Sequence, residues 1–262
     1  DEVIHQLQQL SKQFREVVLT GIHTGRYQDQ GYNLTDLMKR LMKEVEGLQR
    51  LRISSIEITE ITDEMIAFMH EEPRIARHFH IPVQASTNEI LEKMNRPYTV
   101  EEFISRLQYI REQLPNISIS TDIIVGFPGE TSEDVEETID VIRKVKYDNA
   151  FTFIYSKRTG TPAAAMENQV PEPEKTKRSN VLLEMEAKDS AAFREYYLGK
   201  TTELLFEEKK EISGQEYWIG HTKEYVKVAL LDDGQDYANY LVKGIITQTF
   251  NKEMLLMEQS DI

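Results

Sequence analysis

The chain has 262 residues, 40% of them hydrophobic, which is enough for one large domain with a buried core, or for a large and a small one. Its formal net charge of −14 argues against a nucleic-acid binder with an overall basic surface. The absence of cysteine excludes disulfides, thiolate-bound metals and a cysteine-bound iron–sulfur cluster within these residues. No membrane span and no signal peptide are predicted, so we expect a cytoplasmic protein. Because the sequence starts within a helical pattern, we also expect a fragment truncated at its N-terminus.

Short β-rich runs alternate with helical patterns over the first 165 residues. Strands are predicted at 16–20, 51–55, 78–83, 117–125 and 150–155. Helix N-caps are predicted at Thr62, at Thr99 with Glu102 three residues later, and at Thr131 or Ser132. Repeated β-then-α units predict a parallel sheet, which is either doubly wound or an incomplete barrel.

The pattern changes after Pro171 and Pro173. Residues 174–197 predict a long charged helix that ends at Gly199. Beyond it, short strand-like runs with turn signals predict a small all-β barrel. We therefore expect three parts, at 1–170, 171–198 and 199–262.

Polar residues gather near the predicted strand ends, where barrels and open parallel sheets bind ligands. In HFHIPVQ, alternation places His78, His80 and Gln84 on the face opposite Phe79. The polar face as a whole predicts a lumen that holds a polar ligand, whereas each histidine alone is better explained as a satisfied core residue. Two histidines without a third ligand do not predict a metal site.

Other candidates carry two interpretations each. Asp122 lies in an apolar strand and either accepts hydrogen bonds from a ligand's hydroxyl or amine or pairs with an arginine. Glu57 ends the second strand and either contacts a ribose or faces solvent. Gly21 permits close backbone approach. Lys157 and Arg158 form a basic pair suited to phosphate or carboxylate, or else a solvated loop.

The run Gly126-Phe127-Pro128-Gly129-Glu130 superficially resembles a phosphate cradle at a helix N-terminus. Glu130, Glu133 and Asp134 already place negative charge there, which opposes phosphate binding. The run therefore predicts a tight backbone turn beside an uncharged part of a ligand.

Taken in order, GIHTG, RISSIE, HFHIPVQ, STDIIVGFPGET and FIYSKRTGTPAA resemble the successive strand ends of the radical-SAM methylthiotransferases. The resemblance covers nearly the whole chain. It implies an α/β fold with a partial parallel βα (TIM-like) barrel, followed by a small all-β barrel similar to the RNA-associated TRAM module. GIHTG and RISSIE are similar to the branch that acts on N6-threonylcarbamoyladenosine at tRNA position 37. AFTFIYS is more similar to the isopentenyladenosine branch.

The resemblance also implies a chemistry. A [4Fe-4S] cluster on a CxxxCxxC loop would cleave S-adenosylmethionine to a radical that abstracts hydrogen from C2 of the modified adenine. A second [4Fe-4S] cluster and a second S-adenosylmethionine would support methylthiolation. The residues implied to line the S-adenosylmethionine site are Gly21, Glu57, Gln84 and Asp122. Lys157 and Arg158 are implied to meet the substrate tRNA at its anticodon loop.

Two departures from the family pattern stand out. The cluster loop and the N-terminal cluster domain are absent, so we expect no catalytic residue, no metal ligand and no activity in this chain alone. Gln84 is followed by Ala85-Ser86, where Ser-Gly is usual. Two alternatives stay open: a non-catalytic RNA-binding module, and a cofactor-free barrel enzyme that uses His78, His80 and Asp122 as acid–base groups.

Overall fold

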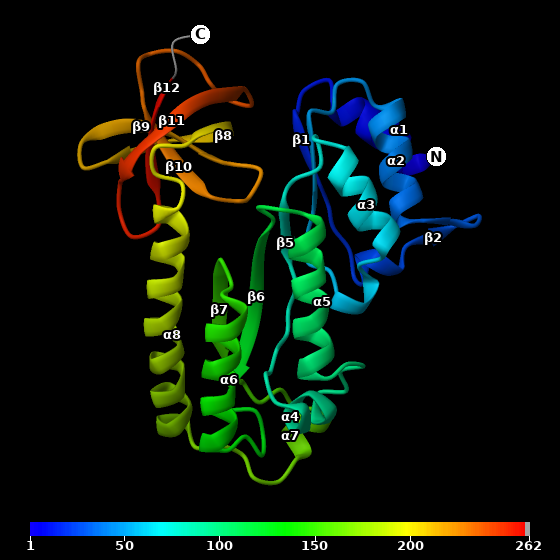
Figure 1. Ribbon diagram of the computed structural model, residues 1–262, viewed down its shortest axis with the longest axis vertical. Coiled ribbons are helices and arrows are strands. Elements are labelled where there is room, and N and C mark those ends of the chain that lie inside the picture. Colours follow the sequence, from blue (N-terminus) through cyan, green and yellow to red (C-terminus); the bar gives the residue numbers. More distant parts are fainter. Residues whose placement is uncertain (260–262) are drawn as a thin grey trace.

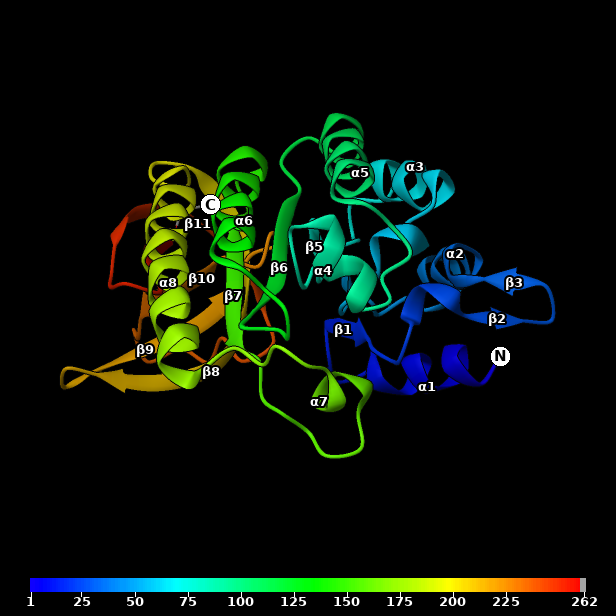
Figure 2. The same cartoon turned by 90° about the horizontal axis from the view of Figure 1, so that it is seen from below.

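The structure, a computed structural model, describes residues 1–259 and has two parts (Figure 1). The first part is built on five parallel strands, β1 (Glu16–Leu19), β4 (Arg50–Ile53), β5 (His78–His80), β6 (Ser118–Val125) and β7 (Asn149–Ile154). β1 pairs with β4, and β6 lies between β5 and β7. Parallel bridges from Leu51 to Ile75 and from Ser55 to His80 join the two groups. The five strands thus form one row in chain order, and in Figure 2 this row is an arc whose end strands β1 and β7 stay apart.

Helices connect and cover these strands. They are α1 (Glu2–Leu10), α2 (Leu34–Glu44), α3 (Asp63–Glu71), α4 (Asn88–Lys93), α5 (Val100–Gln113), α6 (Ser132–Val145), α7 (Pro162–Ala165) and α8 (Glu172–Glu195). The connections also contain a small hairpin, β2 (Gln28–Asp29) and β3 (Tyr32–Asn33), and two short 3-10 turns, η1 (Thr24–Arg26) and η2 (Ile58–Glu60). Among the described helices, none is both long and apolar enough to cross a membrane.

The predicted caps are confirmed. Thr62 accepts a hydrogen bond from the Met65 N–H, and Thr99 forms a capping box with Glu102. Of the two candidates at the start of α6, Thr131 is the N-cap and closes a capping box with Asp134. These side chains satisfy N–H groups that have no partner within the helix, and this fixes where each helix begins.

Helix α8 connects two parts of the chain and also covers part of the strand row. It packs along β7 and contacts β6, and in Figure 1 it runs beside the strands over their whole length. It buries the side chains of Lys175, Arg178 and Leu182 against the first part. The expected division at residues 170 and 199 stays a prediction.

The second part is a closed five-stranded barrel of β8 (Thr201–Ile212), β9 (Gln215–His221), β10 (Lys227–Leu231), β11 (Leu241–Thr249) and β12 (Leu255–Gln259), in the order β10-β12-β11-β8-β9. Phe206, Val228 and Leu255 are buried in its core. At Gly220 a Cβ would stand 2.1 Å from the Leu205 carbonyl oxygen, so only glycine lets β8 and β9 approach this closely. The predictions of an α/β fold and of a small all-β barrel are confirmed.

The barrel lies at the N-terminal ends of the parallel strands, whereas α4 and α7 lie at their carboxyl ends (Figure 1). Arg50 and Arg52 of β4 donate to the barrel carbonyls of His221 and Thr222, at 3.0 Å and 3.1 Å. Asn239 accepts a hydrogen bond from the Arg15 N–H at 2.9 Å, just before β1. These contacts leave the carboxyl ends of the strands uncovered by the barrel.

Candidate functional site

Gln84 and Asp122 are joined through their backbones near the carboxyl ends of β5 and β6. The Gln84 N–H donates to the Asp122 carbonyl at 2.9 Å, and the Ile124 N–H donates to the Gln84 carbonyl at 2.8 Å. Gln84 has a φ of 69°, a left-handed conformation that costs about 1–2 kcal/mol for a residue with a Cβ. The two hydrogen bonds hold it there, so the structure brings these two predicted residues together.

The predicted strand 78–83 ends earlier, at His80. Pro82 has no N–H for a strand ladder, and the turn at Gln84 interrupts the extended run. Gln84 itself forms an isolated parallel bridge with Ile123. Burial raises the pKa of Tyr98 to about 12, so its hydroxyl keeps its proton and donates toward the Pro82 carbonyl at 3.4 Å. Tyr98 therefore supports the irregular segment that leads to Gln84.

Asp122 pairs with a histidine, whereas the sequence suggested an arginine or a ligand. His80 Nε2 lies 3.2 Å from Asp122 Oδ2, and His80 Nδ1 lies 2.9 Å from Ser120 Oγ. His78 Nε2 bonds the same hydroxyl at 2.9 Å. No donor among residues 1–259 bonds the other Asp122 oxygen, Oδ1, and a quarter of the side chain is exposed. One carboxylate oxygen is thus available to a ligand.

Glu57 already has a protein partner. Its Oε1 lies 2.5 Å from Arg96 Nη1, and about a fifth of each side chain is exposed. The pair ties the end of β4 to the segment between α4 and α5. A ligand would share Glu57 with Arg96.

Gly21 opens the loop after β1. A Cβ there would meet only Thr24 Oγ1 at 3.6 Å, which is ordinary contact, so no contact within the protein requires glycine. Gly21 borders a cavity of about 530 Å³ beside β1 and α1. The position is open to close approach from outside the chain.

Glu60 holds this loop and was missed by the sequence reasoning. Its buried Oε1 lies 3.0 Å from His23 Nδ1 and 2.9 Å from Arg26 Nε. At Gly25 a Cβ would fall 2.3 Å from the Glu60 Cβ, so the glycine makes room for the carboxylate. The sequence did contain a signal for this role, because Glu60 is a charged residue among the isoleucines that follow RISSIE.

Lys157 and Arg158 lie in the exposed loop that follows β7, at the same end of the strand row as Asp122. No carboxylate in the described part of the chain pairs with either side chain. No hydrogen bond or ion pair within residues 1–259 links them to Gly21, Glu57 or Asp122. The structure thus records no direct bond between the expected substrate residues and these expected cofactor residues within the described part of the chain.

The turn at Gly126 is tight, as predicted, and it is anchored from within the protein. The Gly126 N–H donates to Glu130 Oε1 at 2.9 Å, and Arg178 Nη1 lies 2.7 Å from the same oxygen. Gly126 has a φ of 76°, and a Cβ there would lie 2.3 Å from Lys175 Cγ. Arg178 and Lys175 both come from α8, which the sequence had suggested only as a connector.

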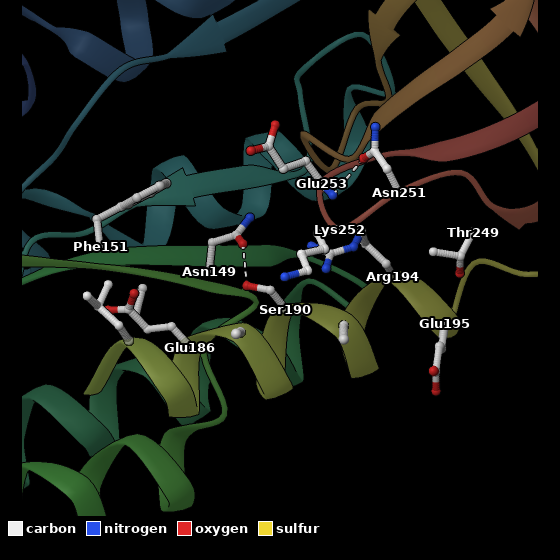
Figure 3. Close-up of a pocket in the computed structure, with 14 residues that line it drawn as sticks. Asn149, Phe151, Glu186, Ser190, Arg194, Glu195, Thr249, Asn251, Lys252 and Glu253 are labelled. Atoms are coloured by element: carbon white, nitrogen blue, oxygen red, sulfur yellow. Dashed lines mark hydrogen bonds between the residues drawn. The ribbon is translucent and has the colours of Figure 1, made fainter. Parts of the chain in front are cut away.

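Of two further cavities, the first lies away from the predicted residues and the second is lined by His78 and His80. One of about 680 Å³ lies between β7, α8 and the loop 249–253 (Figure 3); Asn149 accepts from Ser190 there at 2.7 Å, beside Arg194 and Lys252. Another of about 580 Å³ lies inside the strand arc, toward the barrel, and is bordered by His78 and Tyr225. Within residues 1–259 no group of three or more His, Asp or Glu side chains is placed to hold a metal ion.

Comparison with known proteins supplies the family. Residues 1–142 match the radical SAM superfamily. The chain belongs to this superfamily. It is 42% identical over 232 residues to the Bacillus subtilis threonylcarbamoyladenosine tRNA methylthiotransferase MtaB, a match covering 87% of this chain and 51% of that protein. It is 38% identical over 251 residues to a tRNA-2-methylthio-N(6)-dimethylallyladenosine synthase of Carboxydothermus hydrogenoformans, covering 95% and 57%.

The chain thus spans about half the length of the curated relatives it matches. Among solved structures, SuiB of Streptococcus suis aligns with a TM-score of 0.48 at 13% identity, covering 70% of this chain and 40% of that one. At these values the likeness carries no argument about fold or function.

The superfamily implies S-adenosylmethionine and an iron–sulfur cluster. The residues present do not fit the cluster, because the chain has no cysteine. They do fit the cofactor: within residues 1–259 no donor bonds one of the Asp122 carboxylate oxygens, and Gly21 is open to approach. Both lie at the carboxyl side of parallel strands, where this kind of architecture binds ligands.

Proposed function

We propose that the chain is the C-terminal part of a radical-SAM tRNA methylthiotransferase. In this proposal residues 1–170 form a partial TIM-like barrel, 171–198 are the helical connector and 199–262 are a TRAM-like module. The observation that carries the proposal is the pair of Gln84 and Asp122, which backbone hydrogen bonds join near the carboxyl ends of the parallel strands. Residues 1–142 of the same chain match the radical SAM superfamily. Relatives at about 40% identity are named as tRNA methylthiotransferases.

Four residues hold the cofactor in this proposal. Asp122 accepts from a hydroxyl or ammonium group through Oδ1, and Gln84 offers its amide beside it. Gly21 lets the backbone approach the ligand, and Glu57 shares its carboxylate between the ligand and Arg96. Radical formation and methyl supply belong to bound S-adenosylmethionine and to two [4Fe-4S] clusters whose cysteines lie outside this chain.

The proposed substrate is tRNA in the cytoplasm, at the anticodon loop. Lys157 and Arg158 meet its phosphates, because they are exposed cations without a carboxylate partner among the described residues. We assign the threonylcarbamoyladenosine branch from GIHTG and RISSIE alone, because the 42% identity to the Bacillus subtilis enzyme is matched by a relative named for dimethylallyladenosine. The dimethylallyladenosine (isopentenyladenosine) branch is the alternative, with relatives of 38–42% identity.

The test uses the reading frame extended to include the cluster cysteines, with its clusters reconstituted. Mass spectrometry of digested tRNA should show 2-methylthio-N6-threonylcarbamoyladenosine. Asp122→Ala and Gln84→Ala should each lower formation of 5′-deoxyadenosine at least tenfold, because a misplaced cofactor is costly in rate. Glu136→Ala removes an exposed carboxylate from α6 and serves as the control.

Different outcomes would overturn different parts of the proposal, namely the substrate branch or the activity itself. A product formed only on dimethylallyladenosine would overturn the branch and keep the family activity. A reconstituted enzyme that makes no 5′-deoxyadenosine would overturn the activity itself. Paired Lys157→Ala and Arg158→Ala substitutions should reduce tRNA modification more than 5′-deoxyadenosine formation.

A second candidate is a non-catalytic RNA-binding module, and the closed five-stranded barrel favours it, because small β-barrels commonly bind nucleic acid. Titration of this chain with an anticodon stem-loop at several salt concentrations tests it. Tight binding that does not need the upstream segment would support this candidate. The net charge of −14 predicts weak binding instead.

A further inference from the structure

A line of polar side chains in contact with one another runs along the inner face of the strand arc. It consists of His78, Ser120, His80 and Asp122, and we call it the polar line. β5 and β6 pair in register, with His80 opposite Ser120. Successive contacts along the line measure 2.9, 2.9 and 3.2 Å. The line leads from the barrel side of the arc to the carboxylate proposed to hold the cofactor.

The hydrogen-bond inventory gives the polar line a direction. The contact of 3.2 Å with the Asp122 carboxylate favours the His80 tautomer that carries its proton on Nε2, and in this tautomer Nδ1 accepts from the Ser120 hydroxyl. Ser120 has one proton, so it accepts from His78, which must carry its proton on Nε2. His78 Nδ1 is then a bare lone pair, which agrees with its being buried without a hydrogen-bond partner among the described residues.

His78 is consequently held by one hydrogen bond and by packing. Burial, followed by the charge of Arg52, lowers the pKa of His78 to about 3, so the ring stays neutral. One face of the imidazole is stacked on a neighbouring aromatic ring. That ring belongs to Tyr225, whose centroid lies 5.0 Å from that of His78 at an interplanar angle of 21°.

Tyr225 comes from the other part of the molecule, in the turn between β9 and β10. Its ring also stacks on His221 at 4.6 Å, and the Arg52 guanidinium lies 4.8 Å from its centroid. Its φ of 66° is left-handed, and a strained residue of this kind persists where its surroundings fix it. Thr222 fixes the turn, because its carbonyl accepts from the Tyr225 N–H at 3.1 Å and Arg52 bonds the same carbonyl at 3.1 Å.

We propose that Tyr225 is a positioning residue: its ring fixes the orientation of His78, and the polar line passes that restraint to the carboxylate of Asp122. The C-terminal barrel would thereby set the geometry of a residue farther along the inner face of the strand arc. Only the cofactor role of Asp122 rests on the proposed function; the restraint on the polar line does not.

The first experiment reads the imidazoles directly in the chain of 262 residues. Long-range ¹H–¹⁵N correlation spectra report the tautomer of each ring, and six histidines are few enough to assign by substitution. In wild type, His78 and His80 should both carry the proton on Nε2. Tyr225→Ala should shift both rings toward averaged tautomers, and Tyr225→Phe should restore the wild-type signals because it keeps the stacked ring.

Two further variants serve as controls for this experiment. Tyr240→Ala removes a 60% exposed tyrosine from the same barrel and should leave both imidazoles unchanged. Tyr225→Leu keeps apolar bulk without a flat ring, and it replaces the alanine variant should that variant fail to fold. His80 signals that coincide with wild type in a folded Tyr225→Ala or Tyr225→Leu chain would overturn the proposal.

The second experiment adds the cofactor. Calorimetric titration with S-adenosylmethionine should show affinity reduced several-fold in Tyr225→Ala and retained in Tyr225→Phe. Equal losses in the two variants would overturn the role of the stacked ring. Imidazoles that shift while affinity stays constant would uphold the restraint on the polar line and remove Asp122 from the proposed cofactor site.

Discussion

Charged side chains at the two ends of the parallel strands differ in the partners they have within the protein. At the N-terminal end, Arg50 and Arg52 share the carboxylate of Glu16, at 3.2 Å and 2.8 Å, and donate to carbonyls of the barrel. At the carboxyl end, Asp122 keeps one oxygen without a donor among residues 1–259, and Arg158 has no carboxylate within that range. The arginines at the first end hold two parts of the molecule together, whereas Asp122 and Arg158 at the second end remain available to ligands.

This difference follows the rule for parallel strand architectures, in which one face is structural and the other carries the loops that bind ligands. It also locates the proposed function, because stability and binding are encoded at opposite ends of the same strands. Substitutions at the two ends should therefore have separable effects.

The largest expected effect is on stability, at Arg50. Its side chain is almost fully buried, and burial lowers its pKa despite the neighbouring Glu16. Arg50→Ala leaves the partly buried Glu16 carboxylate and the His221 carbonyl short of a partner. It should lower the free energy of unfolding by roughly 3–5 kcal/mol, measured by urea denaturation followed by circular dichroism.

The control for that experiment is Arg143→Ala on α6. Arg143 pairs with Asp140, and both side chains are more than two-thirds exposed. Exposed pairs contribute little, so the change should stay within about 0.5 kcal/mol. Similar losses in the two variants would break the distinction between a structural end and a solvated surface.

The second effect concerns acid sensitivity through His78. Burial first, and then the charges of Arg52, His80 and His221, lower its pKa to about 3. Below pH 6.5 the unfolded chain takes up a proton that the folded chain excludes, so stability falls as the pH drops toward 3. Between pH 6.5 and 4.5, wild type should lose about 2 kcal/mol more than His78→Gln.

Urea titrations of both proteins across that pH range measure this difference. Carboxylates that titrate in the same range contribute equally to the two proteins and cancel. Parallel pH profiles would mean that His78 is not held neutral beneath Tyr225.

A third effect tests the turn at the carboxyl end. Gly126→Ala and Gly160→Ala both place a Cβ at positive φ, but only the first puts it against Lys175, since nothing lies within 4 Å at Gly160. Backbone strain costs each variant about 1–2 kcal/mol. Gly126→Ala should be less stable than Gly160→Ala by about 1 kcal/mol, and equal unfolding midpoints would show that Lys175 does not fill the turn.

The smallest effect on stability is expected at the basic pair. Lys157 and Arg158 are exposed, so replacing both with alanine should change the free energy of unfolding by less than about 0.5 kcal/mol. Differential scanning calorimetry checks this. A large loss of stability would show that the pair serves the fold, contrary to its proposed role with tRNA.

Much of the local structure was predictable from the sequence, because local signals need only neighbouring residues. The capping residues Thr62, Thr99 and Thr131 each bond an N–H three positions along the chain. Strand alternation placed His78 and His80 on one face, and the short runs after Gly199 identified an all-β part. The sequence motifs at the strand ends, taken in order, also carried the resemblance that the superfamily match confirms.

The sequence by itself thus determined the elements, their caps and the residues that face the lumen. Only the tertiary structure decided their partners. Arg50 meets the carbonyl of a residue 171 positions away, Arg178 reaches Glu130 across 48 positions, and Tyr225 covers His78 from another part of the chain. Periodicity and capping signals do not predict such pairs, because the pairs depend on strand order and on the docking of the barrel. For the same reason the sequence placed Asp122 beside a ligand or an arginine, and the fold placed His80 there.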